Sequence, residues 1–172
     1  MKVVGLAGWS GSGKTTLLVG LLPELIGRGF TVSTAKHAHH EFDIDRPGKD
    51  SFAHRQAGAA EVLVTSALRW ALVHENRGAP EVSFEQVIAR LSPVDLVIVE
   101  GFKHHDHDKI EVYAASNGRP LQAADDSRIF AVASDIALAN APVPVIDRND
   151  IAGIADLLIA HCDLQPAAPG TA

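Results

Sequence analysis

Short runs of apolar, often β-branched residues recur along the chain, as is typical of the strands of an α/β protein. These runs predict eight strands, at Lys2–Ala7, Phe30–Ala35, Val62–Thr65, Trp70–Val73, Asp95–Val99, Ile110–Tyr113, Ile129–Ala133 and Val143–Ile146. Between several of them the apolar positions follow a helical period, which predicts helices at Lys14–Ile26, Ser51–Ala59, Ser83–Leu91 and Ile151–His161. Strands alternating with helices indicate a three-layer, doubly wound α/β fold with a mostly parallel sheet.

Two local features modify this pattern. Pro23 lies inside the first predicted helix, where it removes one backbone hydrogen bond, so we expect the helix to kink or restart there. Only a short connection separates the runs at Val62–Thr65 and Trp70–Val73, which is typical of a β-hairpin. We therefore expect some antiparallel pairing and a mixed sheet.

The length and composition are those of one globular domain. With 172 residues, 47% of them hydrophobic, the chain can bury a core of its own but is short for two domains of ordinary size. We expect a single domain over residues 1–162. The last ten residues, 163–172, carry two prolines and a glycine and are expected to form a disordered tail.

The charge and the single cysteine narrow the classes of function. A formal net charge of −6 argues against a general nucleic-acid binder, which needs an excess of lysine and arginine. Cys162 alone cannot form an internal disulfide, which suits a reducing cytosol. The apolar run near the start is too short for a signal peptide or a membrane span. We expect a cytoplasmic protein that does not bind a membrane.

A phosphate-binding motif follows the first predicted strand directly. Residues Gly8–Thr15 match the pattern G-x-x-x-x-G-K-[ST], and a helix is predicted to begin within it. In such a P-loop the backbone N–H groups and the helix N-terminus face phosphate oxygens. Lys14 is expected to reach the β- and γ-phosphates and Thr15 to ligate Mg²⁺. The predicted nucleotide-binding residues of this segment are Gly8, Ser10, Gly11, Ser12, Gly13, Lys14, Thr15 and Thr16.

An acidic residue at the end of a second central strand is expected to hold the magnesium through its water shell. Glu100 ends the apolar run from Asp95 and precedes a glycine, at the edge where ligands collect in open α/β sheets. A solvated carboxylate at a strand end is the alternative. Asp43 and Asp45, in the loop after the second predicted strand, are weaker candidates for the same metal or for positioning water.

The densest polar segment follows the second predicted strand. If that strand neighbours the P-loop strand, its loops overhang the same crevice and can hold a second anion or the γ-phosphate. The candidates for this second anion site are Lys36, Lys49 and Arg55.

Two groups of histidines invite a transition-metal interpretation. They are His37, His39 and His40, and His104, His105 and His107. Imidazole is a common ligand for zinc and nickel, but neither group includes a cysteine, and the second lies in an acidic, loop-like segment. We favour adventitious metal binding over a physiological site.

Several of these segments together resemble the MobB family of small P-loop proteins. Beside the P-loop, the matching segments are DIDRPGKDS at 43–51, HRQAGA at 54–59, and VEGFK at 99–103, within a resemblance that spans most of residues 3–135. The P-loop is generic, whereas the other three segments in combination are distinctive.

The resemblance implies a GTP-binding homodimer with slow intrinsic GTP hydrolysis. It further implies an accessory role beside the nucleotidyltransferase MobA, which joins GMP to molybdopterin in molybdenum-cofactor biosynthesis. The chain lacks an Asn-Lys-x-Asp motif for guanine, so we name Asp135, which follows a later strand, as the candidate contact to guanine N1–H and N2–H₂. A capping aspartate is an equal alternative for this residue.

Two other classes of protein share the P-loop. A metallochaperone GTPase that loads nickel or zinc is suggested by the nine histidines, and it would bind metal stoichiometrically and tightly. A small-molecule kinase would need a mobile lid rich in arginine, and the sequence shows no such segment. From the resemblance we expect a GTP-binding adaptor, and its candidate catalytic residues are Lys14, Glu100 and Asp43.

Overall fold

A computed structural model describes residues 1–38, 42–102 and 105–165. The chain divides into two compact units. The first, the P-loop unit, consists of Met1–His37 and Val87–Ala172, and the second, the hairpin unit, is Ala38–Gln86. The predicted single domain stays a prediction, and most of the predicted tail lies outside the described residues.

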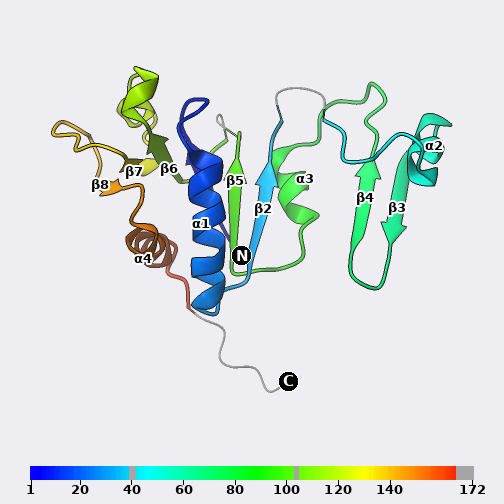
Figure 1. The fold of residues 1–172 in the computed structure, drawn as a ribbon, viewed down its shortest axis with the longest axis horizontal. Helices are drawn as coiled ribbons and strands as arrows, with labels where there is room; N and C mark the ends of the chain where they lie inside the picture. Colours follow the sequence, from blue (N-terminus) through cyan, green and yellow to red (C-terminus); the bar gives the residue numbers. More distant parts are fainter. Residues whose placement is uncertain (39–41, 103–104, 166–172) are drawn as a thin grey trace. The chain divides into compact units, whose positions relative to one another are not determined.

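The P-loop unit is built on a six-stranded sheet with the strand order β2-β5-β1-β6-β7-β8, in which every pairing is parallel (Figure 1). Its strands are β1 (Lys2–Ala7), β2 (Val32–Lys36), β5 (Leu96–Glu100), β6 (Lys109–Tyr113), β7 (Ile129–Ser134) and β8 (Val145–Asp147). The carboxyl ends of parallel strands share one edge of the sheet. The loops after β1 and β5 therefore meet there, as ligand sites in open α/β sheets require.

Two helices cover one face of this sheet (Figure 1). Helix α1 (Lys14–Gly27) contributes three fully or almost fully buried leucines, Leu17, Leu21 and Leu25, and α4 (Ile151–Cys162) packs beside it. The α1 helix runs through Pro23 without a restart, because the one missing N–H costs less than the burial that the leucines on either side provide.

The opposite face carries charged side chains under short turns. On β6, Glu111 is fully buried and accepts hydrogen bonds from the backbone N–H groups of Gln122 (2.9 Å) and Ala123 (2.8 Å), in the 3₁₀ turn η2 (Gln122–Ala124). Lys109, 3% exposed, donates to Asp126 Oδ2 at 3.1 Å. A second 3₁₀ turn, η1 (Ala115–Asn117), follows the end of β6. These polar contacts fix the segment between β6 and β7.

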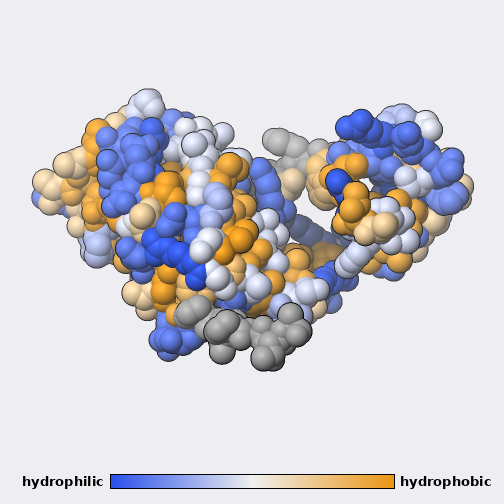
Figure 2. Space-filling view, turned by 60° about the horizontal axis from the view of Figure 1, so that its bottom comes forward, coloured by the Kyte–Doolittle hydropathy of each residue, from blue (hydrophilic) through white to orange (hydrophobic). Residues whose placement is uncertain are grey.

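The hairpin unit is a small two-stranded antiparallel sheet with a helix. It contains α2 (Asp50–Gln56), β3 (Glu61–Thr65) and β4 (Trp70–His74), and α3 (Phe84–Ala89) begins at its end. Val62 is the one buried hydrophobic side chain among its described residues. Several other hydrophobic residues reach the surface of the chain (Figure 2).

All eight predicted strands and four predicted helices are present, with ends shifted by up to three residues. One prediction about their arrangement was wrong. The predicted antiparallel pair exists, but it forms a sheet of its own, because β3 and β4 pair only with each other among the described residues, so the main sheet is parallel rather than mixed. The predicted second anion site had the condition that the second strand neighbours the P-loop strand, and this condition is not met, because β5 lies between β2 and β1. In the part of the chain that is described, no helix is long and apolar enough to cross a membrane.

Candidate nucleotide-binding site

The P-loop turns sharply at its first residue. Gly8 has φ +134°, and a Cβ atom there would lie 2.4 Å from the carbonyl oxygen of Val112 and 2.8 Å from Ser12 Oγ. No L side chain fits this backbone conformation or this space. The loop can leave β1 and pass close to β6 only because residue 8 is glycine.

The side chain of Lys14, near the end of the P-loop, folds back over the loop. Its Nζ donates to the carbonyl oxygens of Gly8 and Trp9, both at 2.9 Å. The ammonium group is thereby held across the mouth of the loop, where it can bind an anion that the loop encloses.

The first turn of α1 has the form of an anion site. Gly13 is its N-cap and no side chain caps it, and its first turn holds no acidic residue, so its N–H groups and partial positive charge are open to a ligand. Ser12 Oγ is buried and lacks a hydrogen-bond partner among the described residues. A phosphate oxygen in the loop would satisfy it. Thr15 and Thr16 are exposed, as ligands to a metal and a phosphate must be.

Glu100 reaches the same edge of the sheet from the neighbouring strand. It ends β5 in register with Leu6 of β1, two residues before the P-loop begins. Its side chain is 13% exposed and lies 3.8 Å from Lys36 Nζ at the end of β2. Gly101 follows with φ +91°, and a Cβ atom there would lie 2.5 Å from the carbonyl oxygen of His37. The structure thus places Glu100 at the same edge of the sheet as the P-loop, and its predicted role at magnesium stays a prediction.

Three contacts from other segments hold the P-loop from outside, and the sequence did not reveal their residues. Trp9 Nε1 donates to the carbonyl of Pro120 (2.9 Å), Asn117 Nδ2 donates to that of Ser10 (3.2 Å), and Arg148 Nη1 donates to that of Ser12 (3.3 Å). In the sequence, Asn117 and Arg148 could have been suspected only because each follows a predicted strand.

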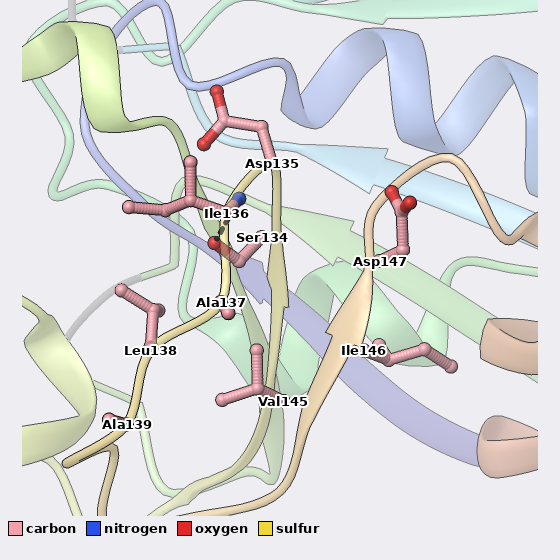
Figure 3. Close-up of a pocket in the computed structure, with 9 residues that line it drawn as sticks. All are labelled: Ser134, Asp135, Ile136, Ala137, Leu138, Ala139, Val145, Ile146 and Asp147. Atoms are coloured by element: carbon pink, nitrogen blue, oxygen red, sulfur yellow. Dashed lines mark hydrogen bonds between the residues drawn. The ribbon is translucent and has the colours of Figure 1, made fainter.

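Asp135 directly follows the end of β7. It lines a pocket of about 550 Å³ formed with the end of β8, and Figure 3 shows the Asp135 and Asp147 side chains at its rim. Asp135 Oδ1 accepts from the N–H of Ala115 (2.9 Å), and Oδ2 lies 3.5 Å from Arg148 Nη2. The carboxylate thus holds the start of η1, and to pair with a guanine edge it would have to exchange these contacts.

The remaining candidates belong to the hairpin unit. Arg55 is bound by carboxylates there: Asp43 Oδ2 lies 2.7 Å from its guanidinium, Glu75 Oε1 3.0 Å and Asp45 Oδ2 3.8 Å. The hydrogen bonds from Arg55 lower the pKa of the Asp43 carboxyl. Lys49 is exposed at the N-cap of α2. The geometry supports Arg55 and Asp43 as a network that holds this unit, and their predicted roles at the phosphates stay predictions.

The histidines form no metal cluster within the described ranges, where no group of three or more potential ligands is found. His39, His40 and His104 lie outside these ranges. His107 is buried against β1, where its Nε2 would lie 2.5 Å from a Cβ on Gly5, and burial, with the charges of Lys109 and His105, lowers its pKa to about 4. This imidazole is neutral at physiological pH.

Comparison with known proteins adds sequence relatives. The chain is 43% identical over 168 residues to the molybdopterin-guanine dinucleotide biosynthesis adapter protein of Escherichia coli, covering 96% of this chain and 95% of that protein. It is 37% identical over 158 residues to the protein of the same name from Haemophilus influenzae, covering 92% and 88%.

Solved structures of similar fold also carry the MobB name. A crystal structure of molybdopterin-guanine biosynthesis protein B aligns with a TM-score of 0.69 at 26% identity, covering 94% of this chain and 99% of the other. Bacillus subtilis MobB aligns with a TM-score of 0.71 at 20% identity, covering 96% and 99%, and at that identity shows the fold alone. The family model described as molybdopterin guanine dinucleotide synthesis protein B matches residues 3–135, and this chain belongs to that family, MobB.

Proposed function

We propose that this chain is a GTP-binding adaptor in the synthesis of molybdopterin guanine dinucleotide. The observation that carries the proposal is the preformed P-loop. Lys14 reaches across this loop, and the buried Ser12 hydroxyl in it has no hydrogen-bond partner in the part of the chain that the structure describes. The names of the relatives supply the pathway. In this role the loop holds the triphosphate of GTP, the substrate that provides GMP.

Magnesium fits the oxygen donors at this edge of the sheet. The Thr15 hydroxyl follows the phosphate-binding lysine, and the Glu100 carboxylate ends the adjacent strand. Mg²⁺ prefers such hard oxygen ligands together with phosphates and water. We propose that Thr15 ligates the metal directly and Glu100 through water, which permits slow GTP hydrolysis. Asp135 is the proposed guanine contact. Lys36 in the P-loop unit, and Lys49 and Arg55 in the hairpin unit, are each proposed as contacts to an anion.

We further propose that the protein is a homodimer joined through its hairpin unit. One face of the hairpin carries the cross-strand pairs Leu63 with Leu72 and Thr65 with Trp70. Leu63, Leu72 and Trp70 are 62%, 44% and 66% exposed. Exposed apolar surface of this kind marks an association site, and a second copy presents a matching apolar face.

A reconstituted assay tests the adaptor role. A MobA-type nucleotidyltransferase is supplied with molybdopterin and GTP at a concentration below saturation, with and without this chain. We expect the chain to raise the rate of dinucleotide formation and to bind GTP in preference to ATP. Equal binding of both nucleotides together with an unchanged rate would contradict the proposal.

A further inference from the structure

Two carbonyl groups of the P-loop accept hydrogen bonds from side chains that follow the ends of two other strands. Asn117, in η1 after β6, donates to the carbonyl of Ser10, and Arg148, just after β8, donates to that of Ser12. A trans peptide group is planar, with its C=O and N–H pointing in opposite directions. The N–H groups of Gly11 and Gly13, which share these peptide groups, therefore point away from Asn117 and Arg148.

From this arrangement we infer that Asn117 and Arg148 are positioning residues, which turn the Gly11 and Gly13 amides toward the bound phosphates. The inference rests on the proposed phosphate-binding function of the loop. A loop this rich in glycine samples many backbone conformations, and binding must otherwise order it. Because the Ser10 and Ser12 carbonyls are already held in place before a ligand binds, less conformational entropy is lost on binding.

Asp135 contacts both Arg148 and the turn that carries Asn117. One carboxylate oxygen accepts from the N–H of Ala115, which begins the turn carrying Asn117, and the other lies 3.5 Å from the Arg148 guanidinium. Arg148 also lies beside Gly13, with 3.7 Å between its Nη1 and a Cβ placed on that glycine. The ends of β6, β7 and β8 are thus linked to the loop after β1.

The test measures binding of inorganic triphosphate with Mg²⁺ by calorimetry, so that no base contact contributes. We expect Arg148→Met and Asn117→Ala each to lower the affinity about tenfold, equivalent to about 1.4 kcal/mol. Arg128→Met is the matched control, because Arg128 pairs with Asp106 and Asp108 and lies just before β7, at the opposite edge of the sheet. This control should stay within twofold of the parent protein.

A second measurement separates positioning from general damage to the fold. In the ligand-free protein we expect Arg148→Met to shift the NMR amide signal of Gly13, and Asn117→Ala that of Gly11, while signals of the β5 core stay in place. Triphosphate affinities of both variants within twofold of the parent, where Lys14→Ala lowers the affinity roughly 10- to 100-fold, would overturn the inference. Loss of affinity without these amide shifts would overturn it as well, since it would point to a direct contact with phosphate. If Lys14→Ala itself had no effect, the proposed phosphate site would fail first.

Discussion

Strands β5 and β3 are built from similar residues, LVIVE and EVLVT, but they differ in what covers them. Each of the four apolar residues of β5 is at most 1% exposed, because the strand lies between β1 and β2 and is covered on both faces. In β3, Val62 is buried, while Leu63 and Val64 are 62% and 48% exposed. An apolar run thus predicts a strand, but whether its faces are covered by the same chain depends on the topology.

The two units are accordingly held by different forces. The P-loop unit has a continuous hydrophobic core that joins α1, α4 and the sheet. The hairpin unit relies instead on the carboxylates around Arg55 and exposes most of its apolar side chains. A small sheet without a core needs a partner to be stable. The comparison therefore predicts that association depends on one unit and phosphate binding on the other.

The largest expected effect is on association. Leu63→Glu would bury a carboxylate in the proposed apolar interface, and we expect the dimer to weaken at least about 100-fold, equivalent to about 2.7 kcal/mol. Sedimentation velocity measures this change. The control Val19→Glu, at a similarly exposed residue of α1 (63% exposed), should leave the dimer intact. If both variants weakened the dimer equally, association would not depend on the hairpin unit in particular.

The next largest effect is on phosphate binding, through Lys14 in the P-loop unit. Lys14→Ala removes a charge-assisted contact worth about 1.5–3 kcal/mol, so we expect triphosphate affinity to fall roughly 10- to 100-fold. Guanosine binding and the dimer should change little, since the base pocket and the hairpin unit are intact. Isothermal calorimetry with GTP and with guanosine checks this, and equal losses for both ligands would contradict it.

The sequence predicted those features that depend on local residue order. The P-loop, its flanking strand and helix, and Glu100 at a strand end are encoded in contiguous segments. The residues around the loop are not. Asn117 and Arg148 contact it only because β6 and β8 end at the same edge, and the strand order that places them there depends on tertiary packing. The position of β5 between β1 and β2 was missed for the same reason.

Acid should weaken the P-loop unit through His107. The pKa of this buried imidazole is about 4 in the folded protein, against about 6.5 for an unfolded chain, so the folded state binds fewer protons in this range. Its contribution is complete above pH 6.5 and is lost as the pH falls toward 4, by about 2 kcal/mol at pH 5.

Urea unfolding at pH 7 and pH 5 measures this loss. In His107→Gln the difference between the two pH values should shrink, whereas His54→Gln, at an exposed residue of α2, should keep it. An unchanged difference in His107→Gln would show that other groups are responsible.

The smallest expected effect concerns the two carboxylates at opposite ends of β5. Glu100→Gln keeps the size of the side chain and removes its charge, so we expect Mg²⁺ to enhance triphosphate binding less, by about threefold, because a contact through water is weak. Asp95 accepts bonds from the backbone N–H and the hydroxyl of Thr31, both at 2.7 Å, far from the P-loop edge. Asp95→Asn should therefore lower stability and leave the magnesium effect unchanged. Titrations at several Mg²⁺ concentrations distinguish the two, and a loss of the magnesium effect in Asp95→Asn but not in Glu100→Gln would reverse the assignment.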